Sequence, residues 1–124
     1  MQRYRLKPQR APKLTENDVE RACLDFLHLR GYKEHRLHCG RARFPDGTWT
    51  QLEPVGTPDW LLVHSTHPAF YLETKRPGAE LAPGQILKHL ELTRGLRLHV
   101  SVASSVEELR AWLDEHEAQI STRV

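Results

Sequence analysis

Two segments decide the fold expected for this chain: 56-GTPDWLLV-63 and 70-FYLETKRPG-78. Each contains a short run of apolar, aromatic and branched residues, which is typical of a β-strand. Residues 65–69 between them, STHPA, are typical of a turn. We therefore predict an antiparallel hairpin over about residues 59–75 that turns near His67.

The register of this hairpin would bring three ionisable side chains together. Asp59 lies opposite Lys75 in the predicted pairing, and Leu61 lies opposite Glu73. Because side chains alternate between the two faces of a strand, Asp59, Glu73 and Lys75 would emerge on one face at the open end of the hairpin. Two carboxylates and an ammonium group at one place are costly unless a ligand such as a divalent metal ion uses them.

Such a group of side chains suits metal-assisted hydrolysis of a phosphodiester. Mg²⁺ prefers oxygen ligands, usually one or two carboxylates completed by water and substrate phosphate. Asp59 and Glu73 would be the carboxylate ligands, and the backbone carbonyl of Thr74 would add a third oxygen. Lys75 would orient the metal-bound water or stabilise charge in the transition state. The alternative is an ordinary amphipathic hairpin with Glu73 and Lys75 on its solvent face, because this pattern also occurs by chance.

The surroundings of these residues resemble the VRR-NUC branch of the PD-(D/E)xK nuclease superfamily over roughly residues 16–116. The shared elements are a G-x-P-D motif, a hydrophobic strand, an E-x-K motif and a G-A-x-L-x-x-x-Q segment that opens a helix. The matching residues are Gly56, Pro58, Asp59, Glu73, Lys75, Gly78, Ala79, Leu81 and Gln85. The resemblance implies a Mg²⁺- or Mn²⁺-dependent DNA endonuclease, and stand-alone, phage-type members of the family look like structure-selective Holliday junction resolvases.

The family also has an acidic residue on its first helix. Thr15 as N-cap and Asp18 in a capping-box position predict a helix over about residues 16–30. An E-R-x-x-L pattern, similar to the first helix of archaeal-type junction resolvases, selects Glu20 as a further metal ligand, with Glu16 as the alternative. Acids at these positions are also typical of a solvated helix flank.

Gln85 has two interpretations. Pro83 indicates the start of a helix over about residues 83–94, so Gln85 is consistent with an ordinary first-turn residue. In the family the matching glutamine faces the active site, where its amide would bind a water, a phosphate or the lysine. The resemblance therefore implies a place for Gln85 in the active site.

Positive charge gathers near the amino terminus, although the net charge is only +2. Pro8 and Pro12 favour an extended basic arm at residues 1–13, followed by a single nuclease domain at residues 14–124. Basic segments of this kind are typical of contact with the phosphate backbone of DNA, and the alternative is a disordered, solubilising tail. The residues expected to contact DNA are Arg3, Arg5, Lys7, Arg10, Lys13, Arg41, Arg43 and Lys88.

The composition indicates one small intracellular domain. A chain of 124 residues that is 39% hydrophobic has enough material for one core. Cys23 and Cys39 form no C-x-x-C pair, and Cys23 falls on the apolar face of the first predicted helix, so we expect a buried free thiol there. The eight scattered histidines show no zinc-ligand spacing. With neither a membrane-spanning run nor a signal peptide, the expected location is the cytoplasm of a bacterial or phage-infected cell.

The expected fold is α/β, with a mixed central sheet flanked by helices in the restriction-endonuclease-like order αβββαβ. Helices at about residues 16–30, 83–94 and 105–117, a hairpin turning at Asp46-Gly47, the motif hairpin and a strand at about 96–103 make up this fold. A right-handed crossover would place the last strand parallel to residues 70–75.

The expected activity is cleavage of branched DNA. The alternatives are a catalytically silent DNA-binding or scaffold domain, and a flap or nicking nuclease that does not resolve junctions. Because a four-way junction is two-fold symmetric and the chain carries one site, we expect a homodimer. Its candidate contacts are the arm at Phe44–Trp49 and exposed apolar residues near Trp60, Leu62 and Trp112, some of which must belong to the core instead.

Overall fold

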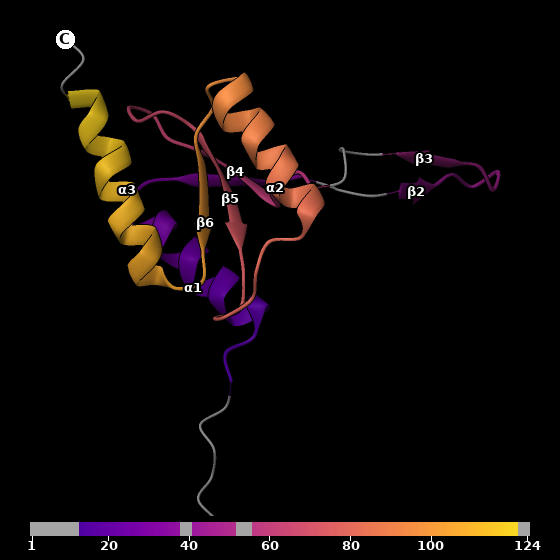
Figure 1. Ribbon diagram of the computed structural model, residues 1–124, viewed down its shortest axis with the longest axis horizontal. Helices are drawn as coiled ribbons and strands as arrows, with labels where there is room; N and C mark the ends of the chain where they lie inside the picture. The colour runs from indigo at the N-terminus through magenta and orange to yellow at the C-terminus, as the bar shows by residue number, and fades with distance from the viewer. Residues whose placement is uncertain (1–12, 38–40, 52–55, 122–124) are drawn as a thin grey trace, which may run out of the picture.

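The structure is a computed structural model that describes residues 13–37, 41–51 and 56–121. Within them the elements are α1 (Glu16–Leu29), β1 (Lys33–Arg36), β2 (Arg41–Arg43), β3 (Trp49–Gln51), β4 (Trp60–Val63), β5 (Phe70–Thr74), α2 (Pro83–Leu90), the π-helical turn η1 (Glu91–Gly95), β6 (Val100–Ala103) and α3 (Val106–Ser121). A four-stranded mixed sheet with helices on both faces is the centre of the molecule (Figure 1). The predicted α/β class is confirmed.

The strands of the central sheet lie in the order β1-β4-β5-β6. β4 pairs antiparallel with β1 and β5, whereas β6 is parallel to β5 as predicted. The last strand begins only at Val100, later than the predicted residue 96, because Leu96 and Leu98 donate their N–H groups to carbonyls of η1. The sequence did not single out β1, whose four residues, KEHR, are polar and largely exposed.

The register of the β4–β5 hairpin differs from the prediction. Leu61 pairs with Tyr71 rather than with Glu73, and residues 64–69 connect the two strands. The ring of His64 closes this turn by accepting hydrogen bonds from the backbone N–H groups of Thr66 and His67, at 3.0 and 3.3 Å. Because the partner changes by two positions, every side chain keeps its predicted face.

The main core lies between the sheet and the pair α1 and α3. Alternate residues of β5 and the inward faces of the two helices fill it, and its buried members include Val19, Cys23, Leu27, Leu62, Phe70, Leu72, Leu109 and Leu113. Cys23 is a free, buried thiol, as predicted, and burial raises its pKa to about 11. Cys39 lies outside the described residues.

Two of the candidate dimer contacts belong to this core, in line with the expectation that some of them would, and they are excluded as contacts. Leu62 is fully buried beneath α1 and α3, and Trp60 is buried on the same face of β4. Trp112 packs against the core from α3, with its ring 4.8 Å from that of Phe70. Residues 60 and 62 lie on the same face of β4 because side chains alternate along a strand. The sequence alone does not say which apolar face of the strand is covered.

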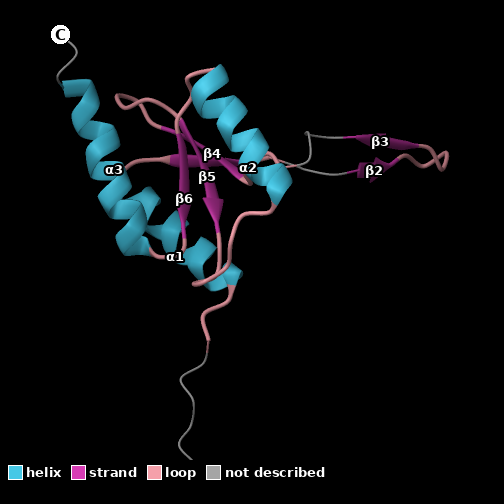
Figure 2. Ribbon diagram, in the orientation of Figure 1, coloured by secondary structure: helices cyan, strands magenta, loops and turns pink. Residues whose placement is uncertain are grey.

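The β2–β3 hairpin stands apart from the central sheet as a separate two-stranded ribbon (Figure 2). It turns at Asp46 and Gly47 as predicted, and Asp46 accepts hydrogen bonds from the backbone and hydroxyl of Thr48. Phe44 and Trp49 are exposed on it. This is the arm expected from the sequence. None of the helices in the described part of the chain is both long enough and apolar enough to cross a membrane.

Candidate active site

The G-x-P-D segment is held against the first turn of α2 by a glycine. Gly56 has a φ angle of +90°, and a Cβ atom added to it would lie 2.5 Å from the carbonyl oxygen of Gly84. Only glycine permits so close an approach in this conformation. Pro58 is fully buried next to it, so Asp59 enters β4 from a fixed position. The contact also brings the first turn of α2 to the end of β5.

Glu73 is the centre of the site. It is 2% exposed, although it is a carboxylate at the next-to-last position of β5. Its Oε2 atom accepts a hydrogen bond of 3.2 Å from the backbone N–H of Asp59, and its Oε1 atom accepts one of 2.7 Å from Nε2 of Gln85. Nζ of Lys75 lies 3.8 Å from the same Oε1 atom. Asp59, Glu73, Lys75 and Gln85 are therefore brought together, as the sequence predicted.

Gln85 is a first-turn residue of α2 that also contacts Glu73, whereas the role implied by the resemblance stays a prediction. Its Oε1 atom accepts a hydrogen bond of 2.9 Å from the backbone N–H of Ala82, which caps the start of α2. Its Nε2 atom donates to Glu73. Because the amide oxygen is used by the helix, the amide nitrogen must face the carboxylate, and the side chain is locked between the two.

The two carboxylates of the site hold their protons more strongly than usual. Burial, followed by the charge of Asp59, raises the pKa of Glu73 to about 7, against the opposing influence of Lys75. Burial also raises the pKa of Asp59, and the charges of Glu20 and Glu16 on α1 add to that effect. Lys75 thus offsets the negative charge only in part.

Both predicted helix carboxylates lie at the border of the site. Glu20 has the larger influence on the pKa of Asp59, and its Oε1 atom lies 3.9 Å from Nη1 of Arg36. Glu16 has the smaller influence on Asp59 but also raises the pKa of Glu73. Among residues 13–37, 41–51 and 56–121, no three acidic, histidine or cysteine side chains are positioned to bind one metal ion. The helix carboxylate as a third ligand, and the choice between Glu20 and Glu16, stay predictions.

The side chains present fit a hard divalent cation. Asp59 and Glu73 offer carboxylate oxygens, and each oxygen of Glu73 accepts only one or two close donors. A cation would take the place of the proton that the raised pKa retains. Thr74 of β5 is fully buried and pairs with Ala103 of β6. The use of its carbonyl as a ligand is still a prediction.

Of the residues predicted to contact DNA, those that the structure describes are divided among the arm, α2 and the segment before α1. Arg41 and Arg43 lie on β2 of the arm, where the guanidinium of Arg43 lies over the ring of Trp49 at 5.9 Å. Lys88 forms an ion pair of 3.2 Å with Glu91 on α2. Lys13 borders a pocket at the start of α1. The others, Arg3, Arg5, Lys7 and Arg10, lie outside the described residues.

Sequence reasoning missed His89, which lies one helical turn after Gln85 on α2. It is 7% exposed, and its Nε2 atom has no hydrogen-bond partner in the part of the chain that the structure describes. Burial lowers its pKa, and the charge of Lys75 lowers it further, so the ring faces the site as a neutral group. The four-residue spacing from Gln85 was the available signal, because such residues share a helix face.

Comparison with known proteins assigns no family to this chain. No protein-family model matches the chain, and the search of curated proteins returns no significant match either. The geometry of Asp59, Glu73, Lys75 and Gln85 is therefore the basis for any assignment of function.

Proposed function

We propose that this protein is a metal-dependent DNA endonuclease that hydrolyses phosphodiester bonds, with Asp59 and Glu73 as ligands of Mg²⁺ or Mn²⁺. One observation carries the proposal. Glu73 is buried with a raised pKa, it is oriented by the Asp59 backbone and by Gln85, and its negative charge is only partly balanced by Lys75. An idle site of this kind would gain stability by losing one of its charges.

Each side chain has a defined task in this proposal. A bound divalent ion supplies a water of lowered pKa and neutralises charge on the phosphate. Gln85 holds Glu73 in one orientation through its amide nitrogen. Lys75, whose backbone N–H is anchored to the carbonyl of Ala103, extends its ammonium group to the same carboxylate. There it stabilises the negative charge that develops on the phosphate during hydrolysis.

The architecture supports the resemblance to the PD-(D/E)xK nucleases. Leaving the arm aside, the chain runs through α1, β1, β4, β5, α2 and β6, and this sequence of elements is consistent with an αβββαβ core. The site lies where β4 begins and β5 ends, next to the first turn of α2. The restriction-endonuclease-like core and membership of the VRR-NUC branch are part of this proposal.

The substrate in this proposal is branched DNA, recognised by shape and phosphate contacts rather than by sequence. The arm carries basic residues beside two exposed aromatic rings, Phe44 and Trp49, and it stands clear of the central sheet. It is the remaining predicted surface for DNA or for a second copy of the chain. A flap or nicking activity without junction resolution is the second candidate, because one chain carries one site.

The test is cleavage of a panel of end-labelled DNAs in the presence of Mg²⁺ or Mn²⁺. The panel holds four-way junctions, flaps, nicked duplexes and linear duplexes of matched sequence. We expect cleavage that requires the metal and favours a branched substrate. Absence of cleavage of every DNA with either metal would contradict the proposal.

Assembly decides between junction resolution and single-strand cutting. We expect a two-fold dimer that buries more than about 1,000 Å², in which Phe44 and Trp49 of the arm contribute. Sedimentation at micromolar concentration, with and without a junction, measures it. A protein that stays monomeric on DNA would exclude paired cuts and favour the flap or nicking activity.

A further inference from the structure

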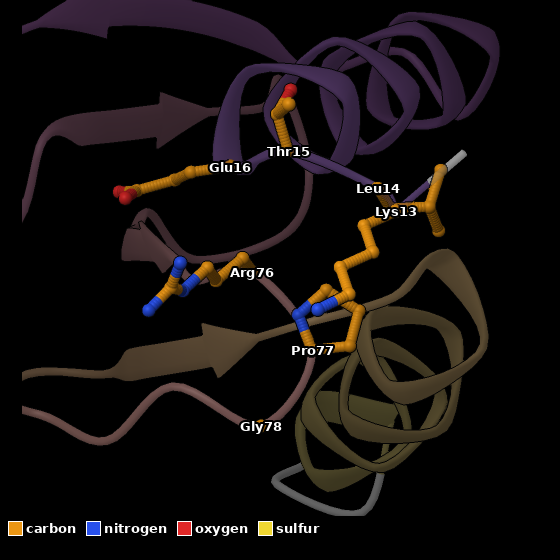
Figure 3. A pocket seen from close by; sticks show the side chains of 7 residues that line it. All are labelled: Lys13, Leu14, Thr15, Glu16, Arg76, Pro77 and Gly78. Atoms are coloured by element: carbon orange, nitrogen blue, oxygen red, sulfur yellow. The ribbon is translucent and has the colours of Figure 1, made fainter. Parts of the chain in front are cut away.

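A pocket of about 780 Å³ opens beside the candidate active site, between the start of α1 and the segment that follows β5 (Figure 3). Lys13, Leu14 and Glu16 form one wall, and Arg76 and Pro77 form much of the other. Its volume lies within the range of pockets that hold small ligands. None of the tasks given to the site so far uses it.

The lining combines an apolar surface with positive charge. Leu14 is 59% exposed and lines the pocket together with Pro77. Glu16 and Arg76 extend to the same side of the pocket, whereas the side chain of Lys13 reaches towards Pro77 (Figure 3). Two cations against one carboxylate leave the lining positive, so it suits an apolar, planar group that carries an anion.

The pocket lies near the carboxylate site, although Asp59, Glu73 and Lys75 do not line it. Arg76 directly follows Lys75 in the chain, and Glu16 lies close enough for its charge to raise the pKa of both Asp59 and Glu73. A ligand in the pocket would therefore lie next to a phosphate bound at Glu73. Thr15 contributes little to such a ligand, because its hydroxyl accepts the N–H of Asp18 to cap α1.

We propose that this pocket binds one unpaired nucleotide of the DNA strand, adjacent to the phosphate that is cut. Its base and sugar pack against Leu14 and Pro77, and its phosphate pairs with Arg76 and Lys13. This inference rests on the proposed nuclease function and deepens it. A base enters such a pocket only after it leaves its stack, and the cost is smallest where pairing is already broken. The pocket thus selects DNA with an unpaired nucleotide at the cut, as at a branch point or flap.

The charged half of the pocket is tested by binding of a fluorescent single-stranded oligonucleotide, measured by anisotropy over a range of salt. The protein carries Asp59→Asn throughout, so that no cleavage occurs. Lys13→Ala and Arg76→Ala should each reduce the slope of log affinity against log salt by roughly 0.7. Arg94→Ala is the matched control, because Arg94 lies in η1 at the far end of α2 from Gln85, and it should leave the slope unchanged. Equal slopes for all three variants would overturn the inference.

The apolar half is tested by replacing the nucleotides of the oligonucleotide one at a time with abasic sites. We expect a loss of affinity of about fivefold at one position, at the lower end of base-stacking effects. Leu14→Ser should abolish that loss while leaving the other positions unchanged. A loss spread evenly over all positions, or one that persists in Leu14→Ser, would overturn the inference. So would tight binding of a free nucleoside monophosphate that depends on Arg76 while oligonucleotide binding does not.

Failure of this inference and failure of the nuclease proposal give different results. If DNA is cut with metal but Lys13→Ala, Arg76→Ala and Leu14→Ser all bind like the parent, the pocket is not a nucleotide site. If these variants weaken binding as expected but the protein with Asp59 intact cuts no DNA with either metal, the nucleotide pocket stands and the catalytic assignment of Asp59 fails.

Discussion

The β4–β5 hairpin carries ionisable side chains at both of its ends, and the two ends handle them differently. At the turn, every polar atom of the His64 ring is bonded to the backbone. Nδ1 accepts from the N–H groups of Thr66 and His67, and Nε2 donates to the carbonyl of Arg30 at 3.1 Å. His116 of α3 likewise uses its Nε2 atom to bond the carbonyl of Pro68, at 2.9 Å. Nδ1 of His67 in the same turn is the exception, because it is buried without a hydrogen-bond partner in the described part of the chain.

The contrast is sharpest between two glutamates. Burial alone would raise the pKa of Glu117 at the turn end, but hydrogen bonds from Arg30 at 2.7 Å and Tyr32 at 3.1 Å outweigh it and hold the pKa below its usual value. At the open end, burial and Asp59 raise the pKa of Glu73, and Lys75 at 3.8 Å does not compensate.

The difference separates a structural role from a chemical one. The partly buried Glu117 is paired with a cation that the chain itself provides, whereas the charge of the buried Glu73 is balanced only when it takes up a proton or an external cation. Each end of the hairpin contains a carboxylate beside a cationic side chain, so the presence of such a pair does not distinguish the two ends. The state of compensation is what distinguishes the open end as the candidate active site.

The strongest way to break this comparison is to remove a carboxylate from each end. Asp59→Asn should abolish DNA cleavage, because it removes a proposed metal ligand, while circular dichroism shows an unchanged fold. Glu117→Gln should leave cleavage close to that of the parent protein. Nuclease activity in Asp59→Asn near the parent level would show that the open end is not the catalytic site.

Lys75→Ala separates catalysis from metal binding at the open end. We expect the cleavage rate to fall by about two to four orders of magnitude, as for loss of one transition-state contact or proton-transfer group. Affinity for Mn²⁺, measured by calorimetry, should stay the same or improve, because a competing positive charge is gone. A variant that no longer binds Mn²⁺ would make Lys75 a structural residue instead.

The two glutamates should respond to pH with opposite signs. The folded pKa of Glu73, about 7, lies above its usual value of 4.5, so its ionisation makes the folded state less stable as pH rises through that interval. Glu73→Gln should therefore raise the melting temperature by a few degrees at about pH 8 without divalent metal, and give no gain at about pH 4.

Glu117 is the matched control for that measurement. Its folded pKa is lowered, so its stabilisation is present at neutral pH and is lost as pH falls through the folded pKa. Glu117→Gln should lower the melting temperature at about pH 8, and the difference should shrink in acid. Calorimetric melting curves in which both variants shift the same way would remove the distinction between the two ends.

The basic amino-terminal segment should affect the affinity for DNA but not the properties of the side chains at either end of the β4–β5 hairpin. Deleting residues 1–12 removes Arg3, Arg5, Lys7 and Arg10 and should flatten the salt dependence of duplex binding by about 0.9 for each lost phosphate contact. The rate at saturating DNA should largely recover. An unchanged salt slope would assign the segment to something other than DNA contact.

Local rules predicted much of the fold. The Thr15–Asp18 capping box starts α1 as expected, Gly31 ends it with a φ angle of +87°, and Ser105 caps the first turn of α3 through the N–H of Glu108. Faces along β4 and β5 were also predictable, because side-chain alternation survives a shift of two residues. These features depend on neighbours in the sequence.

The features that escaped prediction depend on contacts between distant segments. The hairpin register was set by His64 in the turn, and β1 forms only because β4 offers a partner for a polar segment. His89 gained its place from the packing of α2 beside Lys75. The two hydrogen bonds of Gln85 depend on the close approach of Gly56 to Gly84. No local sequence pattern predicts that approach.

Calorimetric titration with Mn²⁺ in the absence of DNA tests the central claim most directly, because it asks whether the open end of the hairpin takes up an external cation. We predict binding to the parent protein, loss of that binding in Asp59→Asn and Glu73→Gln, and its retention in Glu117→Gln. Parent-like binding in Glu73→Gln, or no binding to the parent protein, would contradict the account.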